Sequence, residues 1–206
     1  MSTSDEINQK HNERMQRVNE VKDKQLAEAT REKGLIIVHT GGGKGKSTAA
    51  FGMAGRSLGQ GMKVGIVQFI KGAIATGESA FFAQLASLGM PIEMHTLGEG
   101  FTWKTQDRER DIATAARGWQ KAVELIRDPS FDLVILDELN IATKYEYIPI
   151  ATVIEELLHK REMLHVVLTG RNAHPDLIEI ADLVSEMKVI KHPYGHGVKP
   201  QRGVEF

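Results

Sequence analysis

Cysteine is absent from all 206 positions of the chain. This absence excludes disulfide bonds, zinc sites built from thiolates and catalysis by a cysteine nucleophile. It is compatible with a reducing compartment, and we expect the protein to be cytoplasmic.

Long apolar runs and an excess of charge of one sign are missing as well. No stretch approaches the ~20 apolar residues that a membrane-spanning helix needs, and the N-terminal residues lack the apolar core of a signal peptide. The formal net charge of −1 creates no overall field that would attract nucleic acid or an anionic membrane. We therefore expect a soluble protein whose partners include neither nucleic acid nor membrane.

The most informative segment that is present is the octapeptide TGGGKGKS at residues 40–47. It follows an apolar run at residues 35–38 and precedes a helix-like run at residues 48–54. A strand, a glycine-rich loop and a helix in this order are typical of a P-loop, in which backbone N–H groups and the helix N-terminus bind phosphate. Thr40 stands where the strict pattern has glycine, and a glycine-rich turn with a chance lysine is the alternative.

Two side chains of this loop have predicted roles of their own. Lys46 is expected to reach the phosphates, and the Ser47 hydroxyl is expected to bind Mg²⁺ or Mn²⁺. The other nucleotide-binding residues predicted in the loop are Gly41, Gly42, Gly43, Lys44, Gly45 and Thr48.

A second motif, FDLVILDE at residues 131–138, has the form of a Walker B strand. Its apolar residues predict a buried strand, and its acidic residues follow at the carboxyl end, which borders the ligand crevice of an open α/β sheet. Asp137 and Glu138 are both candidates to bind the metal ion, directly or through water. Either one could instead cap the next helix or pair with a neighbouring cation.

From Gly34 onward, apolar segments alternate with helical ones, which predicts an α/β fold with a mostly parallel central sheet and helices on both faces. We expect a single P-loop (RecA-like) domain at residues 34–206 and an N-terminal helical arm at residues 1–33, polar with a thin apolar stripe. The arm is either a solvated tail or a lid over an active site, and the end from Pro193 is expected to be extended. The expected strands are 35–38, 64–70, 92–96, 133–136, 165–168 and 184–190, and the expected helices are 47–59, 79–88, 108–126, 150–160 and 175–183.

Beyond the two motifs, the chain resembles the P-loop family of corrinoid adenosyltransferases. The shared stretches occur in the family's order, and the sequence GEGFTWKTQ with the ending GVKPQRGVEF makes the resemblance specific. Gly42 and Ser47 depart from the usual asparagine and threonine, and the segment near residues 73–97 is longer than usual. The shared stretches are residues 34–52, 64–72, 98–106, 133–140, 166–171 and 197–206.

This resemblance implies an enzyme of adenosylcobalamin biosynthesis or salvage. It would transfer the 5′-deoxyadenosyl group of ATP to the cobalt(I) of a corrinoid, either a complete cobalamin or a precursor, and release triphosphate. Such a reaction needs no general base, because cobalt(I) carries no proton; it needs a clamp on the leaving triphosphate and a near-attack geometry. The resemblance also implies Mg²⁺, a reduced flavoprotein as electron donor, and a homodimer.

The resemblance assigns the polar site residues individually. Ser47 and Glu138 match the family's metal-binding positions. Asp137 is then expected to support these ligands from behind and not to bind the ion directly. Arg56 matches a basic residue that contacts phosphate, although an exposed helix cation is the alternative.

Two aromatic residues complete the implied site. Phe101 and Trp103 would pack below the corrin and displace its lower axial ligand, which makes cobalt(II) easier to reduce. Together with Lys46 they are the predicted catalytic residues. The alternative is a loop whose aromatic side chains only pack under the sheet edge.

Two rival functions use the same motifs. One is an NTPase or kinase that acts at the γ-phosphate, and the other is a non-catalytic protein that binds a nucleotide or a corrinoid.

Of the histidines, His192 and His196 are expected at the surface, and His39 is expected to be buried and hydrogen-bonded.

Overall fold

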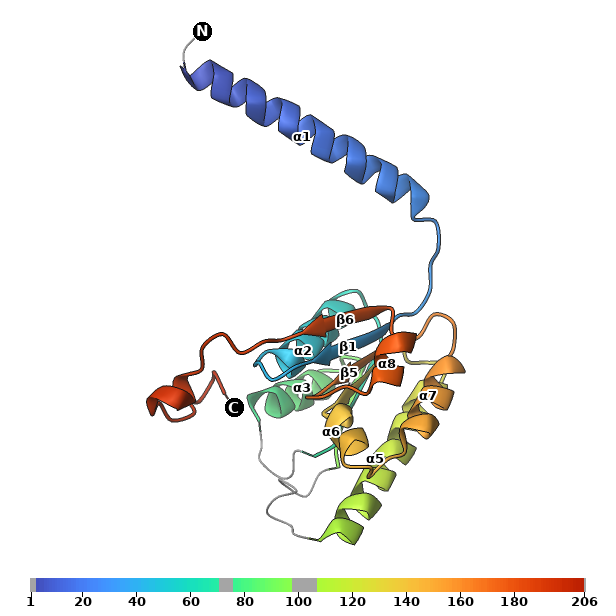
Figure 1. The fold of residues 1–206 in the computed structure, drawn as a ribbon. Coiled ribbons are helices and arrows are strands. Elements are labelled where there is room, and N and C mark those ends of the chain that lie inside the picture. Colours follow the sequence, from blue (N-terminus) through green and yellow to red (C-terminus); the bar gives the residue numbers. More distant parts are fainter. Residues whose placement is uncertain (1–2, 71–75, 98–106, 206) are drawn as a thin grey trace. The chain divides into compact units, whose positions relative to one another are not determined.

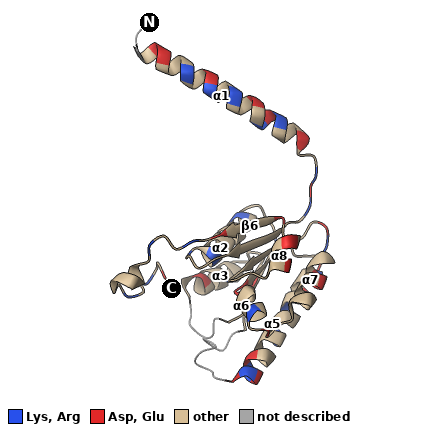
Figure 2. Ribbon diagram, in the orientation of Figure 1, with Lys and Arg blue, Asp and Glu red and all other residues tan. Residues whose placement is uncertain are grey.

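The computed structural model describes residues 3–70, 76–97 and 107–205 and contains two compact units, Met1–Lys33 and Gly34–Phe206. The first unit contains the helix α1 (Thr3–Glu28), along which basic and acidic residues are interspersed (Figure 2). Gln9 and Gln16 each donate a hydrogen bond to the glutamate four residues later, a spacing that stabilises exposed helices. Its larger apolar side chains are all exposed: Ile7, Met15, Val18, Val21 and Leu26.

The second unit is built on a six-stranded sheet in which all neighbouring strands are parallel, as predicted. The strand order is β3-β2-β4-β5-β1-β6 (Figure 1). The four central strands are nearly continuous runs of buried residues, because helices cover both faces of a parallel sheet. The strands are β1 (Ile36–Thr40), β2 (Val64–Gln68), β3 (Ile92–Thr96), β4 (Leu133–Asp137), β5 (His165–Thr169) and β6 (Leu183–Glu186).

Helices lie on both faces of this sheet (Figure 1). The pair α2 and α3 packs on one face, where the rings of Phe51 and Phe82 meet edge to face at 5.5 Å. The other face is covered mainly by α5 and α7, with smaller contributions from α6 and α8. The helices of this unit are α2 (Lys46–Gly59), α3 (Gly77–Ser87), α5 (Arg108–Arg127), α6 (Leu139–Lys144), α7 (Ile150–Leu158) and α8 (Pro175–Ile180).

The structure differs from the sequence-based expectations at several elements. The expected strand at residues 64–70 ends at Gln68, and the expected helix at residues 175–183 ends at Ile180, so that Leu183 begins β6. The last strand ends at Glu186 instead of continuing to residue 190. The six-residue helix α6 was not predicted, because so short a helix shows no clear period. The expected extended tail contains the 3₁₀ helix η1 (Pro193–His196), which begins with a proline and ends before Gly197.

Every strand of the sheet points its carboxyl end to the same edge, because all pairings are parallel. The glycine loop follows β1 and the acidic residues follow β4 at this edge, so the fold brings the two predicted nucleotide motifs together. None of the described helices combines the length and the apolar character needed to cross a lipid bilayer.

Candidate functional site

The glycine loop connects the end of β1 to the start of α2. Gly41 and Gly45 have φ values of 97° and 108°, in the left-handed region that favours glycine. A β-carbon would lie 2.4 Å from the carbonyl oxygen of Met187 at Gly41, and 2.7 Å from it at Gly43. The Gly43 N–H donates to this same oxygen at 2.6 Å. The loop therefore requires small residues because the segment after β6 passes directly against it.

Lys46 begins α2 and is buried. Its ammonium group donates a hydrogen bond to the Gly43 carbonyl, so the loop curls around a cation. Gly45 occupies the N-cap position and supplies no side chain to the first N–H groups of the helix. Those N–H groups and the helix dipole favour an anion at this end of α2.

A cavity of about 650 Å³ borders the loop and the start of α2. Its walls come from segments that are far apart in the sequence, including the loop, the residues after β4 and β5, and the C-terminal segment. This volume lies in the range of small-molecule sites. The lining residues are Gly42, Gly43, Lys44, Gly45, Lys46, Ser47, Thr48, Glu78, Glu138, Ile141, Arg171, His192, Tyr194, Val198, Pro200, Val204 and Glu205.

The two acidic residues at the end of β4 occupy different environments. Asp137 is fully buried, and its carboxylate accepts hydrogen bonds from Gln68 Nε2 at 2.9 Å and from Thr169 Oγ1 at 2.7 Å. Glu138 follows in the left-handed conformation, with a φ of 62°, and lines the cavity. Of the two candidate metal ligands, Glu138 thus reaches the cavity and Asp137 lies behind it.

The chemistry of the cavity suits a hard divalent cation. Ser47 supplies a hydroxyl group and Glu138 a carboxylate, and both are oxygen ligands of the kind that Mg²⁺ prefers. Within residues 3–70, 76–97 and 107–205, no three histidine or acidic side chains are placed together to hold a metal ion. A cation here would take its remaining ligands from phosphate and water, as Mg²⁺ commonly does.

Two further predicted site residues, Arg56 and Gly41, do not line this cavity. Arg56 is exposed in the last turn of α2, about 15 Å along the helix axis from Lys46. Gly41 shapes the beginning of the loop without lining the cavity. Phe101 and Trp103 lie outside the described residues.

The contribution of the C-terminal segment was not expected from the sequence. Glu205 forms an ion pair with Lys44 of the glycine loop. His192, expected at the surface, is only partly exposed and lines the cavity with Tyr194, whose N–H donates to its ring Nδ1 at 3.2 Å. In the sequence, only the family-specific ending GVKPQRGVEF marked this segment, and it does not indicate that the segment lies beside the glycine loop.

Glu78 and Arg171 were also missed as cavity residues. Glu78 lies in the first turn of α3, and Arg171 follows β5. Arg171 is exposed and adds positive charge to the wall of the cavity. Its position two residues after the buried strand β5 was the signal that could have identified it, since Glu138 likewise follows β4.

His39 lies near the loop but its environment differs from the expected one. The side chain is buried in β1, and neither ring nitrogen has a hydrogen-bond partner in the described part of the chain. The predicted hydrogen bond is therefore not found among the described residues. Burial lowers the pKa of His39, because a charged imidazolium would lose its hydration there.

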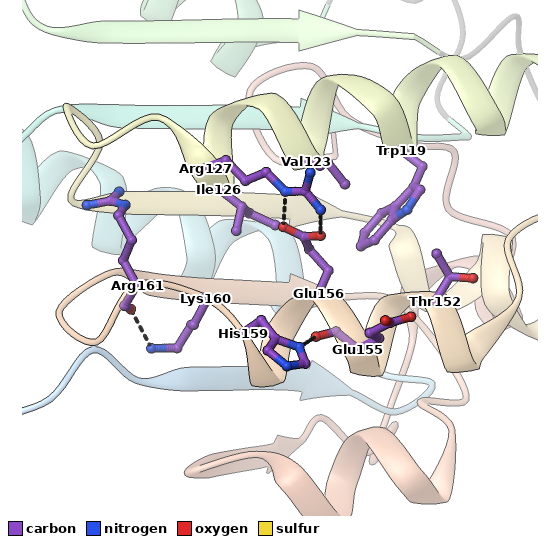
Figure 3. Close-up of a pocket in the computed structure, with 10 residues that line it drawn as sticks. All are labelled: Trp119, Val123, Ile126, Arg127, Thr152, Glu155, Glu156, His159, Lys160 and Arg161. Atoms are coloured by element: carbon purple, nitrogen blue, oxygen red, sulfur yellow. Dashed lines mark hydrogen bonds and ion pairs between the residues drawn. The ribbon is translucent and has the colours of Figure 1, made fainter.

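A second cavity, of about 550 Å³, lies between α5 and α7 (Figure 3). Arg127 and Glu156 form a two-pronged ion pair across it, with N–O distances of 2.9 and 2.6 Å. Lys160 and Arg161 donate to backbone carbonyl groups of the strand ends and turns. The charges of this cavity thus join neighbouring segments of the fold, and we assign it no ligand.

The sequence matches a known family over the whole of the second unit. The family described as ATP:corrinoid adenosyltransferase BtuR/CobO/CobP matches residues 32–206. A corrinoid adenosyltransferase of Pseudomonas aeruginosa is 52% identical over the full length of both chains.

Two further relatives carry the same name. The corrinoid adenosyltransferase of a Sinorhizobium species is 54% identical over 96% of this chain and 92% of its own. That of Escherichia coli strain K12 is 43% identical over 96% of this chain and 98% of its own. The glycine loop and the carboxylate that faces it therefore occur in a chain that belongs to the ATP:corrinoid adenosyltransferase family.

Proposed function

We propose that this protein transfers the 5′-deoxyadenosyl group of ATP to the cobalt(I) of a corrinoid and releases triphosphate. The observation that carries the proposal is a cavity lined by both the glycine loop and Glu138, in a chain of the ATP:corrinoid adenosyltransferase family. In this step the electron pair of cobalt(I) forms the cobalt–carbon bond at the ribose 5′-carbon. The bond between that carbon and the phosphate oxygen breaks, and its electrons leave with the triphosphate.

The loop residues are proposed to hold the leaving group. Lys44, Lys46 and the N–H groups at the start of α2 direct positive charge into the cavity, where charge accumulates as the triphosphate departs. Lys46 is already held in place by the Gly43 carbonyl, so little reorganisation is needed when phosphate arrives. Arg171 adds a second source of positive charge from the end of β5.

Ser47 and Glu138 are proposed to hold Mg²⁺, since both offer oxygen ligands to one cavity. The ion, when bound, neutralises charge on the triphosphate and so makes it a better leaving group. Asp137 contributes from behind, where it accepts hydrogen bonds from Gln68 and Thr169.

The corrinoid end of the reaction is proposed on the family's pattern. Phe101 and Trp103 would pack below the corrin and remove its lower axial ligand. If they do, Trp103→Ala will impair transfer that starts from cobalt(II) more than transfer that starts from chemically supplied cobalt(I). Equal losses in the two assays would contradict this role.

The remaining biological assignments are also part of the proposal. We propose a homodimer in the cytoplasm that receives electrons from a reduced flavoprotein, with a complete cobalamin or a precursor as substrate. We further propose that α1 acts as a lid over an active site. Deletion of residues 1–30 should then speed corrinoid dissociation, and an unchanged rate would reduce the helix to a solvated tail.

Analysis of the reaction products tests the central proposal. The protein is incubated with ATP, Mg²⁺ and chemically reduced cobalamin, and both the cobalt–carbon bond and the phosphate products are followed. Adenosylcobalamin and triphosphate in equal amounts are the expected products. ADP and phosphate without an organometallic product would indicate a γ-phosphate enzyme, and tight corrinoid binding with no turnover would indicate a binding protein.

A further inference from the structure

A row of polar side chains crosses the sheet at its carboxyl edge, on the face covered by α2 and α3. Gln68 is the register partner of both Thr96 and Asp137. Thr169 continues the row on β5, directly after the paired residues Leu136 and Leu168. Gln68, Asp137 and Thr169 are each at most 2% exposed. Polar side chains at such positions are unfavourable unless they bond to one another.

These side chains form a continuous chain of hydrogen bonds. The Thr96 hydroxyl donates to Gln68 Oε1 at 3.2 Å, and Gln68 Nε2 donates to Asp137 at 2.9 Å. The Thr169 hydroxyl donates to the other Asp137 oxygen at 2.7 Å. An ionised carboxylate only accepts hydrogen bonds, which fixes the direction of the Gln68 amide and of the Thr169 hydroxyl.

The row ends on the backbone of Glu138. The Glu138 N–H donates to Thr169 Oγ1 at 3.0 Å, so this hydroxyl donates to Asp137 and accepts from the next residue at once. Glu138 has a φ of 62°, a conformation that is unfavourable for a residue with a side chain. Such a conformation persists only where its surroundings hold it. The hydrogen bond that the Glu138 N–H donates to Thr169 is one such restraint.

The space beside Glu138 is limited as well. A β-carbon at Gly170 would lie 2.9 Å from Cβ of Asn140 and 3.3 Å from Oε2 of Glu138. Asn140 Nδ2 donates to the Gly170 carbonyl at 3.0 Å, which holds the chain after β5 against the start of α6. The carboxylate of Glu138 is thus confined on one side by Gly170 and fixed at its backbone by Thr169.

We propose that Gln68 and Thr169 are positioning residues for the metal-binding carboxylate Glu138, and that Thr96 orients Gln68. This inference rests on the proposed role of Glu138 in holding Mg²⁺. The alternative is that these hydrogen bonds only compensate for the burial of polar side chains and have no effect on Glu138. The two differ in one respect: positioning residues affect metal binding beyond any effect on the free energy of unfolding.

Thr169→Val and Gln68→Met remove the two donors to Asp137 with little change in volume. The readout is the binding of Mn²⁺ to the complex of the full-length protein with ATP, followed by electron paramagnetic resonance. We expect each variant to weaken Mn²⁺ binding by about 10-fold or more. The affinity for ATP without metal should stay unchanged, because the glycine loop is intact. Thr169→Ser keeps the hydroxyl and should restore Mn²⁺ binding.

Thr114→Val is the matched control. Thr114 is a buried threonine of α5, and its hydroxyl accepts a hydrogen bond from Arg117 at 3.0 Å. This variant should lose stability without any change in Mn²⁺ binding. Thr96→Val tests the same row of hydrogen bonds at an exposed position, where the substitution should not prevent folding. We expect Thr96→Val to lower the affinity for Mn²⁺ about threefold. In the Gln68→Met background it should have no further effect, because the hydrogen bond from Thr96 to Gln68 is already absent.

Folded Thr169→Val and Gln68→Met proteins that bind Mn²⁺ like the wild type would overturn the inference while leaving the proposed function intact. If these two variants do not fold, Thr96→Val decides, and wild-type Mn²⁺ binding in that variant overturns it. A wild-type protein that binds ATP but never Mn²⁺ in its presence would overturn the inference and the proposed metal site together.

Discussion

Lys44 in the glycine loop forms an ion pair with Glu205 near the end of the chain. The Glu205 side chain is largely buried, with 14% of its surface exposed, whereas 53% of the Lys44 side chain is exposed. The Glu205 carboxylate is therefore paired with the Lys44 ammonium group, which the proposed function assigns to phosphate binding. Nucleotide must compete with Glu205 for this ammonium group or share it.

Glu205→Gln should strengthen the binding of ATP, because the neutral amide competes less well for Lys44. Exposed ion pairs contribute about 0.2 to 1 kcal/mol, so the gain in affinity should be about 1.5- to 5-fold. Titration calorimetry with ATP measures the change. Glu124→Gln, which loses a similar ion pair with Lys121 on α5, is the control and should have no effect. Weaker binding by Glu205→Gln would show instead that Glu205 assists the nucleotide.

Lys46→Ala should abolish most ATP binding. A hydrogen bond to a charged group contributes about 1.5 to 3 kcal/mol, which corresponds to a loss of about 10- to 100-fold in affinity. Lys121→Ala removes a lysine from the surface of α5 and serves as the control. Unchanged ATP affinity in Lys46→Ala would contradict the phosphate-binding role of the loop.

The main parts of this site could be predicted because each is marked by a local pattern. β1 and β4 are apolar runs that end in recognisable motifs, and parallel pairing brings those ends to one edge. The choice between Asp137 and Glu138 could not be made from the sequence spacing. It depends on the left-handed turn at Glu138 and on donors from two other strands, and neither leaves a local signal.

The contacts of the C-terminal segment could not be predicted for a different reason. Lys44 and Glu205 lie 161 positions apart, and no periodicity links residues at such a separation. The same holds for Met187, whose backbone meets Gly41 and Gly43. The glycines indicated that another group lies close to the loop backbone, but the sequence suggested only phosphate and not the backbone of Met187.

Gly43→Ala should destabilise the protein. Its β-carbon would lie within 2.9 Å of backbone atoms of Met187 and Lys188, which cannot move aside as a flexible side chain would. Overpacking of this kind costs about 1 to 3 kcal/mol in the free energy of unfolding, measured by urea denaturation. ATP affinity should fall as well, because the loop must shift.

Gly55→Ala is the matched glycine substitution. Gly55 lies within α2, and apart from the adjacent backbone of this helix no atom of the described residues lies within 4 Å of the β-carbon that alanine would add. This variant should be more stable by about 0.5 to 1 kcal/mol, the usual preference of a helix for alanine. Destabilisation of both variants to the same degree would contradict the close approach of Met187 as the cause.

The stability of the protein should decrease as the pH falls below about 6.5, the ordinary pKa of histidine. Burial lowers the pKa of His39, so the unfolded chain takes up a proton in this range while the folded protein does not. Burial and Lys160 lower the pKa of His165 in the same direction. Above this range both rings are neutral in either state, and the full stability is present.

His39→Leu should reduce this dependence on pH, leaving the part that belongs to His165. Urea denaturation at pH 7.5 and pH 5.5 measures the difference for both proteins. Since neither ring nitrogen of His39 bonds within the described chain, the variant should lose little stability at neutral pH. A pH dependence identical to that of the wild type would assign the effect to other groups.

The chain that follows β6 lies against the glycine loop at Gly41 and Gly43 and returns to Lys44 through Glu205. Changes to the sequence of this segment are accordingly expected to alter the conformation of the glycine loop, although the two lie far apart in the linear sequence.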